Sequence, residues 1–299
     1  MTPDSEPAVD RFLRRQKWMD PLAEVIQKIV AGAYRLTGPL ATPLKNVAHG
    51  TWVLHHPLHP ALTDAPLGAW LVGVIADYVA LRTHLIPTQA GDIALIVGLV
   101  AAAGAAVTGY TDFGETYGME RRAGLLHGLV MTTVVVIEAA SVLLRWGGGS
   151  GLHPLAVALA TAGLLLAMFG MYLGGHLVFG FGTMVNRNAF AEPPSGSTDV
   201  GASSDFPDGE MKRVQAGDVA VLVVRLDGKP YAISATCSHA GGPLDEGKIA
   251  GDVVTCPWHG SRFCVRDGSV RKGPATFSQP TFAVKEEGGR LLVTPTLAH

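Results

Sequence analysis

The feature that most constrains this chain is the uneven distribution of its charged residues. Residues 123–182 contain only two, Glu138 and Arg145, whereas residues 210–290 carry charges throughout. Over the whole chain charged residues make up 16%, against about 25% in a typical soluble protein. The sequence therefore predicts an apolar part in a lipid bilayer followed by a soluble part. The formal net charge of −2 gives no sign of a nucleic-acid-binding surface.

Four stretches are apolar and long enough, or nearly so, to cross a bilayer as helices, because a hydrocarbon core of ~30 Å requires about 20 residues. They are residues 66–81, 93–110, 123–144 and 155–180. An even number of spans puts both termini on the same side. The basic residues at the flanks and in the second connection, Lys45, Arg121, Arg122 and Arg187, favour the cytoplasm for the N- and C-termini.

Ionisable side chains in or beside these spans are costly to bury and therefore suggest function. His127 and Glu138 are 11 residues apart, which is about three helical turns, so they share a face. Histidines at one level of a bundle, here His59, His127 and His176, could bind haem b axially or bind a quinone head group. They could equally form hydrogen bonds between helices. Asp77 and Glu138 suggest either a proton route or a buried polar pair.

Residues 50–187 resemble a bacterial family of four-helix membrane domains of unknown function. The matching pieces are HPLHP at 56–60 with Pro66, Thr108-Gly109 with Asp112, His127, and GGxLV at 174–178. His176 stands where an acidic residue is expected in that family, so the resemblance gives His176 no role. It implies a four-span protein of the bacterial inner membrane and supplies no chemistry.

The remaining boundaries follow from composition. Residues 191–205 read AEPPSGSTDVGASSD and have no apolar period, which predicts a flexible tether. It would join a membrane domain at 51–190 to a soluble domain at 206–299. Residues 1–50 include apolar side chains at helical spacing between Leu22 and Ala33, which predicts a helical segment in the cytoplasm or at the membrane interface.

The soluble part shows short β-segments separated by turn residues. Residues 219–226 are rich in valine and precede Asp227-Gly228, and residues 282–284 precede Gly288-Gly289. Such repeated hairpins predict a small antiparallel β-domain.

Two loops of this domain carry metal-ligand residues, Cys-Ser-His at 237–239 and Cys-Pro-Trp-His at 256–259. Two cysteines and two histidines could hold a tetrahedral zinc ion. Zinc sites, however, usually pair Cys with Cys and His with His across short spacings. One Cys and one His in each loop suit a sulfide-bridged iron pair, in which two thiolates bind one iron and two imidazoles bind the other.

Residues 206–295 resemble a Rieske [2Fe–2S] ferredoxin domain through the sequences CSHAGGPL and CPWHGSRF. The resemblance implies that a [2Fe–2S] cluster is bound with cysteines on the buried iron and histidines on the outer one. The ligands would be Cys237, Cys256, His239 and His259. It also implies that Gly273-Pro274 forms a further loop covering the cluster.

This domain departs from other Rieske proteins at two places. Respiratory-complex members carry an extra cysteine in each cluster loop, where this chain has Gly242 and Trp258. We therefore expect no disulfide, which suits the cytoplasm, and an unpaired Cys264. Ser261 keeps the expected hydroxyl group, but Phe263 replaces the expected tyrosine. Because hydrogen bonds to a cluster raise its potential, we expect a value in the middle or lower part of the Rieske range of ~−150 to +300 mV.

The sequence thus predicts separate α and β domains, a four-helix transmembrane bundle followed by a small antiparallel β Rieske domain. A Rieske cluster moves one electron, and we expect none of the mononuclear iron chemistry of an oxygenase. The predicted function is a membrane-anchored electron-transfer protein with its cluster at the cytoplasmic face, a component of an oxidoreductase system rather than a self-contained enzyme. Its partners would be the lipid bilayer and a redox donor and acceptor, protein or quinone. The alternatives are a quinol-linked oxidoreductase subunit and a redox-sensing module.

Overall fold

The structure is a computed structural model, and it describes residues 7–52, 54–83, 85–147 and 154–295. The chain divides into two compact units. Unit 1 contains Met1–Ala41 and Leu58–Thr183, and unit 2 contains Thr42–Pro57 and Met184–His299. Each unit therefore takes residues from two separate parts of the sequence.

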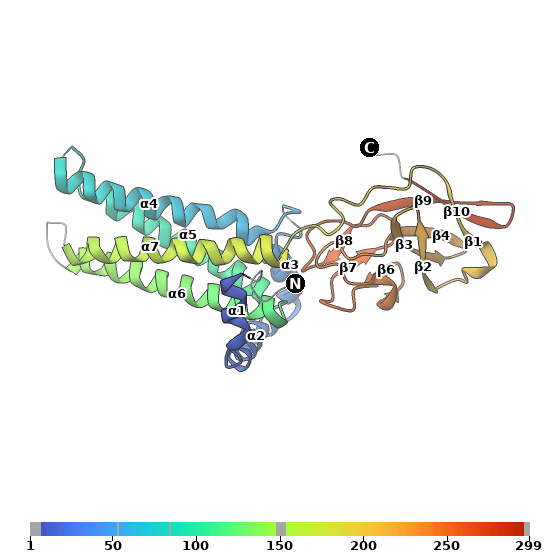
Figure 1. The fold of residues 1–299 in the computed structure, drawn as a ribbon, viewed down its shortest axis with the longest axis horizontal. Helices are drawn as coiled ribbons and strands as arrows, with labels where there is room; N and C mark the ends of the chain where they lie inside the picture. Colours follow the sequence, from blue (N-terminus) through green and yellow to red (C-terminus); the bar gives the residue numbers. More distant parts are fainter. Residues whose placement is uncertain (1–6, 53, 84, 148–153, 296–299) are drawn as a thin grey trace. The chain divides into compact units, whose positions relative to one another are not determined.

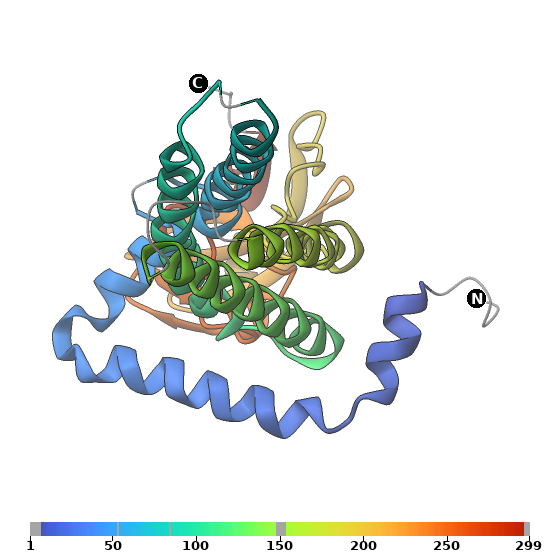
Figure 2. The same cartoon turned by 90° about the vertical axis from the view of Figure 1, so that its left-hand side faces the viewer.

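Unit 1 is built on four long helices, which Figures 1 and 2 show packed as a bundle. They are α4 (Leu58–Thr83), α5 (Gln89–Phe113), α6 (Gly118–Gly147) and α7 (Pro154–His176). All four are apolar enough to cross a membrane, α7 together with the π-helical turn Leu177–Phe181 that follows it. The 23 residues of α7 make about 35 Å at ~1.5 Å per residue, enough for the ~30 Å core. The four-helix prediction is confirmed.

The bundle has a small-residue core and an apolar outer surface. Trp70 of α4 is fully buried, and a Cβ atom at Gly98 of α5 would lie 2.4 Å from its indole nitrogen, so the glycine makes room for the indole. Large apolar side chains instead face outward, among them Val100, Val136, Leu165 and Met168. A water-soluble bundle would present polar groups there, so this surface suits lipid.

The first span begins earlier than the sequence predicts. Helix α4 starts at Leu58 rather than near residue 66, and it contains Pro66. Its first turns are polar, so an apolar window misses them. Pro60 lies in the first turn, where a missing N–H group is tolerated because that group has no partner within the helix.

Two shorter helices, α1 (Ala8–Arg15) and α2 (Met19–Leu36), pack on the bundle. Leu13, Met19 and Ala23 are buried against residues that include Phe113 and Leu125. Polar contacts add to this packing, because Arg122 Nε donates to Asp20 at 2.8 Å and Gln27 donates to the Phe113 carbonyl at 2.9 Å. The amphipathic segment therefore packs on protein along one face.

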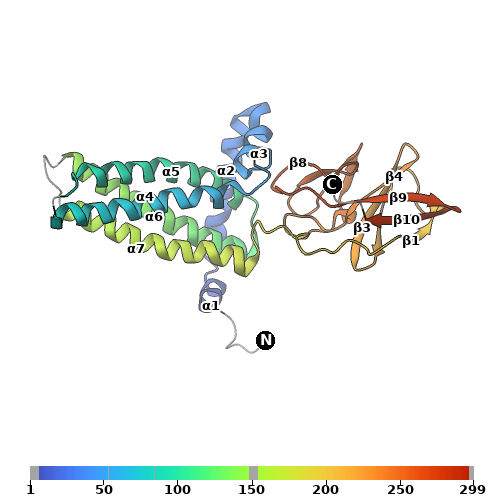
Figure 3. The same ribbon diagram turned by 90° about the horizontal axis from the view of Figure 1, so that it is seen from above.

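Unit 2 contains two antiparallel sheets, visible in Figures 1 and 3. The larger has the order β1-β10-β9-β4-β3-β2 and the smaller has the order β5-β6-β7-β8. The strands are β1 (Thr198–Ala202), β2 (Met211–Ala216), β3 (Val219–Leu226), β4 (Lys229–Ser234), β5 (Lys248–Ala250), β6 (Val253–Thr255), β7 (Arg262–Cys264), β8 (Val270–Lys272), β9 (Thr281–Glu287) and β10 (Arg290–Pro295). The predicted antiparallel β-domain is confirmed.

Turn chemistry and the alternation of side chains explain this fold. Asp227-Gly228 joins β3 to β4 with φ values of 53° and 76°, and Gly288-Gly289 joins β9 to β10 with 57° and 76°. Such positive angles at both central residues are typical of type I′ hairpin turns. Strand β3 is buried on both faces, since Leu222 and Val224 pack in one core cluster and Val221 and Val223 in the other.

The tether prediction for residues 191–205 is wrong in its second half. Thr198–Ala202 forms β1, which pairs with β10 from Thr198 opposite Val293 to Ala202 opposite Arg290, and Ser203–Asp205 forms a 3-10 turn. The strand is at the edge of the sheet and has one neighbour, so it needs little apolar sequence of its own. Because its composition is polar, β1 could not be recognised as a strand from the sequence.

Candidate metal centre

The four predicted ligands lie in two loops of the same design. In the first loop the Cys237 amide donates to Gly242 and the Gly241 amide donates back to Cys237, both at 2.9 Å. In the second loop the Cys256 amide donates to Ser261 at 2.8 Å, and the Gly260 amide donates back to Cys256 at 3.1 Å. Gly241 and Gly260 have φ values of 84° and 72°, which favour glycine. Each loop thus presents a cysteine and then a histidine.

The two cysteine side chains meet in the interior. Cys237 is 1% exposed and Cys256 is 2% exposed. A hydrogen bond from the Cys237 thiol lowers the pKa of Cys256 to about 6, and the amides of Trp258 and His259 act in the same direction against the effect of burial. The hydrogen bond to Cys256 and burial raise the pKa of Cys237, against the amides of His239 and Ala240, which are directed at its sulfur and lower it. The thiolate, the form that binds metal, is therefore favoured at Cys256, and the proton of the pair stays on Cys237.

The two histidine rings form a second pair. The ring centroids of His239 and His259 are 4.9 Å apart and the rings are inclined at 83°. Burial first, and then the charges of His259, His49 and Arg187, lower the pKa of His239 to about 3. The imidazole is thus neutral, as a metal ligand must be. Among the described residues its buried Nδ1 has no hydrogen-bond partner, so a ligand-binding atom is available.

This donor set fits a binuclear cluster better than a single ion. Sulfur lies against sulfur and imidazole against imidazole. Within the described part of the chain, no group of three or more Cys, His, Asp or Glu side chains gathers as a mononuclear metal site requires. A zinc ion needs four ligands around one point, whereas a Rieske cluster needs two like pairs on two irons.

The loop at Gly273-Pro274 lies next to the second ligand loop. The hydroxyl oxygen of Ser261 accepts a hydrogen bond from the Ala275 amide at 3.0 Å, and Ser261 is fully buried. The hydroxyl hydrogen of Ser261 remains available for donation to another acceptor. Phe263 is fully buried in the same core cluster as Cys237 and Cys256, the two predicted ligand cysteines. Cys264 lies in β7 with its sulfur 3.8 Å from Asp252 and forms no disulfide.

A segment far away in the sequence completes this loop. In Thr42–Pro57, which includes most of helix α3 (Ala41–His49), Asn46 Oδ1 accepts from the Gly273 amide at 3.0 Å. Thr51 Oγ1 donates to the Ala275 carbonyl at 3.0 Å. A Cβ atom at Gly273 would lie 2.8 Å from Thr51 Oγ1 and 3.1 Å from a ring carbon of His49, so only glycine fits there. Sequence reasoning missed these three side chains, because no motif marks them.

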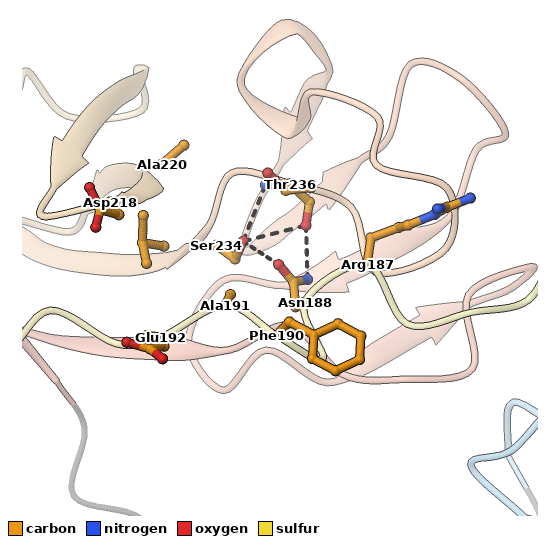
Figure 4. Close-up of a pocket in the computed structure, with 10 residues that line it drawn as sticks. Arg187, Asn188, Phe190, Ala191, Glu192, Asp218, Ala220, Ser234 and Thr236 are labelled. Carbon is orange, nitrogen blue, oxygen red and sulfur yellow. Dashed lines mark hydrogen bonds between the residues drawn. The ribbon is translucent and has the colours of Figure 1, made fainter. Parts of the chain in front are cut away.

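The chain entering unit 2 from residue 184 supports the first ligand loop. The Arg187 amide donates to the Ser238 carbonyl at 3.0 Å. Asn188 donates to the Thr236 carbonyl at 3.0 Å and accepts from Ser234 Oγ at 2.8 Å, as Figure 4 shows. Arg187, Asn188, Ser234 and Thr236 line a pocket of about 350 Å³ that also includes Glu192. None of the four predicted ligands lines this pocket.

In unit 1 the structure brings two of the three predicted histidines together. The ring centroids of His59 and His127 are 6.2 Å apart. His59 Nδ1 donates to the Ala105 carbonyl and His127 Nδ1 to the Gly170 carbonyl, both at 2.9 Å. His176 instead pairs through Nε2 with Asp10 of α1 at 2.8 Å.

Asp77 does not form the polar pair with Glu138 that the sequence suggested. The guanidinium of Arg145 bonds to Asp77 Oδ1 at 2.9 Å and to Asp92 Oδ1 at 3.0 Å. The buried cation is therefore shared by two carboxylates from α4 and α5.

Comparison with known proteins agrees with both parts of this description. The family model of the Rieske [2Fe–2S] domain matches residues 196–283. The model of DUF2231, a predicted membrane protein family, matches residues 55–187, close to the range 50–187 taken from the sequence motifs.

Individual relatives match over about a third of the chain. The ferredoxin component of biphenyl 2,3-dioxygenase from Rhodococcus jostii is 42% identical over 96 residues, 32% of this chain and 90% of the relative. The cytochrome b6-f complex iron-sulfur subunit of Chlorobaculum tepidum is 37% identical over 95 residues, 32% of this chain and 51% of the relative.

One similar solved structure is the ferredoxin of carbazole 1,9a-dioxygenase from Nocardioides aromaticivorans IC177. It is 31% identical, with 34% of this chain and 100% of that chain covered and a TM-score of 0.33. The relatives and the two family models together show that this chain belongs to the Rieske [2Fe–2S] family, with its Rieske domain following a DUF2231 membrane domain.

Proposed function

We propose that the protein is a membrane-anchored electron carrier whose cluster is held by Cys237, Cys256, His239 and His259. The observation that carries this proposal is the pairing of sulfur with sulfur and imidazole with imidazole in two loops of the same design. The Rieske domain implies a [2Fe–2S] cluster, which accepts and releases one electron at a time. The protein would serve as a component of an oxidoreductase system rather than as a self-contained enzyme.

The residues of the chain would bind the cluster and set its potential. Amides directed at both cysteine sulfurs and the hydroxyl of Ser261 would stabilise the added negative charge on reduction. Phe263 offers no such donor. We therefore propose a potential in the middle or lower part of the Rieske range of ~−150 to +300 mV.

We further propose that the cluster domain lies at the cytoplasmic face of the bacterial inner membrane, with both termini in the cytoplasm. The basic residues flanking the spans support this orientation. So does the lack of a disulfide among the three cysteines, as is usual in a reducing compartment. The test is labelling of single cysteines, placed at exposed positions of unit 2, with a membrane-impermeant maleimide on intact cells; labelling from outside would contradict the orientation.

The partner is proposed to be a redox protein or a quinone. Relatives carry names such as ferredoxin component of a dioxygenase and iron-sulfur subunit of a cytochrome complex, so a role between a donor and an acceptor is the common theme. A redox sensor is the competing function. Sustained reoxidation and rereduction by added quinol and an electron acceptor would support the carrier, and a single turnover without further flux would favour the sensor.

Metal analysis of the full-length protein tests the ligand assignment. We expect about two irons and two sulfides per chain. Cys237→Ser should lose both, whereas Cys264→Ser, which removes a buried cysteine outside the ligand loops, should retain them. Zinc in place of iron, or an unchanged cluster in Cys237→Ser, would contradict the proposal.

A second candidate, the quinol-linked oxidoreductase, is favoured by His59 and His127. Each donates Nδ1–H to a backbone carbonyl of a neighbouring helix, and this arrangement leaves Nε2 as the nitrogen for an iron. These two residues would hold haem b, which supplies a second one-electron centre. A Soret band in the purified protein that disappears in His127→Ala and persists in His176→Ala would support it, and cluster bands alone would contradict it.

A further inference from the structure

The membrane unit contains a buried acid that the proposed electron transfer does not use. Glu138 lies in the middle of α6 and is fully buried. Among the residues that the structure describes, neither of its carboxyl oxygens has a hydrogen-bond partner. A Cβ atom at Gly163 of α7 would lie 2.4 Å from Glu138 Oε1, so a glycine provides the space for the carboxyl group.

The charged groups around Glu138 do not supply a partner cation. On α6 itself the nearest is Arg145, and on α4 it is Asp77, which repels a carboxylate. Arg145 already bonds to Asp77 and to Asp92 of α5. Residues 154–181, which contain α7, hold no Asp, Glu, Lys or Arg. Among the residues that the structure describes, the cation that acts on Glu138 is thus committed to two other acids.

An isolated carboxylate in such surroundings is costly. Transfer of an unpaired charge into a medium of low dielectric constant costs several kcal/mol or more, and the group takes up a proton instead. In a membrane span the cost is higher than in a soluble core, because no water reaches the group from the lipid side. A leucine at this position would avoid the penalty altogether, yet the chain has an acid there.

We propose that Glu138 is a proton-binding site of the membrane domain. Its carboxylate takes up one proton to give a neutral carboxylic acid and releases it again when the network around Arg145 rearranges. Ser141 and Arg145 follow Glu138 on the same face of α6, at three and seven residues, and Ser141 lies within 3.3 Å of Arg145 Nε. This face offers a polar route from Glu138 toward the Arg145 end of the helix.

The site is tested with dicyclohexylcarbodiimide, an apolar reagent that adds to protonated carboxyl groups in lipid. The acid O–H adds across one C=N bond, and the adduct rearranges to a stable N-acylurea with no leaving group. We expect full-length protein in detergent to be labelled on the peptide that contains Glu138. Labelling should be lost in Glu138→Gln and kept in Glu120→Gln, a matched change at the beginning of the same helix. Unlabelled Glu138 in the wild type would overturn the proposal.

Infrared spectroscopy shows whether the proton exchanges. The carbonyl stretch of a protonated carboxyl group should be present in the wild type, absent in Glu138→Gln, and lower in frequency after transfer to D2O. A band that is insensitive to D2O would show a sealed structural acid and would overturn the proposal. Cluster absorption should be the same in the wild type and in Glu138→Gln. A failure of the proton-site proposal would therefore leave the electron-carrier proposal untouched.

Discussion

At the scale of single residues, two of the four proposed ligands, Cys256 and His239, are held in the form that binds metal. The pKa of Cys256 is lowered to about 6, chiefly by the Cys237 thiol, and burial lowers that of His239 to about 3. The sequence reveals these residues because each cysteine and its histidine are two or three positions apart. It does not reveal Asn46 and Thr51, because their partners in the Gly273-Pro274 loop lie more than 200 residues away.

Ser261 is predicted to raise the potential of the cluster. In Ser261→Ala the hydroxyl that could donate to the cluster is lost, together with the acceptor of the Ala275 amide. A hydrogen bond worth about 0.5–1.5 kcal/mol corresponds to roughly 20–65 mV for one electron, so we expect the potential to fall by that amount. Redox titration of the visible spectrum measures it. Ser278→Ala, at an exposed serine, is the control, and equal potentials in all three proteins would refute the role.

Asn46 is predicted to stabilise the loop that covers the cluster. Asn46→Ala leaves the buried amide of Gly273 without its acceptor, and a buried unsatisfied donor costs about 1–3 kcal/mol. We expect the free energy of unfolding, measured from the loss of cluster absorption in denaturant, to fall by that amount. A chelator should also remove iron faster. Gln215→Ala, at an exposed position in β2, should match the wild type. Wild-type stability in Asn46→Ala would contradict the contact.

At the scale of elements, patterns of charge and turn residues predicted most of the structure. The four spans follow from long uncharged stretches, and the hairpins follow from Asp227-Gly228 and Gly288-Gly289. Strand β1 was missed because its stability comes from pairing with β10 rather than from its own sequence. For the same reason, nothing in the sequence of α3 indicates that residues 42–57 belong to unit 2.

The attachment of α1 and α2 to α6 should depend on pH. A hydrogen bond from Arg122 holds the pKa of Asp20 below its usual range, so the ionised carboxyl stabilises the folded state above the pKa of the unfolded chain. That stabilisation is lost as the pH falls through the lower folded pKa, that is, below about pH 4.

Hydrogen exchange of residues 8–36 measures this effect. After correction for the intrinsic exchange rate, which itself falls in acid, we expect less protection in acid in the wild type, and less protection already at neutral pH in Asp20→Asn, by an amount equivalent to about 1 kcal/mol or less. Glu24→Gln, on the same helix but with a longer contact to Arg121 of 3.5 Å, should change less. Identical exchange in the wild type and Asp20→Asn at neutral pH would rule out the contribution.

At the scale of the whole molecule, two units are interleaved along one chain. The metal-binding unit is made of residues 42–57 and 184–299, and the four apolar helices lie between them in the sequence. The family matches cover the two parts separately, at 55–187 and 196–283. Neither match includes Asn46 or Thr51, so the hydrogen bonds of these two residues to the loop at 273–275 come from outside both matched ranges.

We propose above all that this molecule carries one electron on a Rieske cluster. The most direct measurement is a redox titration of the full-length protein, followed by EPR and visible absorption. We predict a single one-electron transition in the middle or lower part of the range ~−150 to +300 mV, with a rhombic EPR signal that appears on reduction and is absent in Cys237→Ser. A protein that contains no iron, or that shows no reducible signal in this range, would contradict the account.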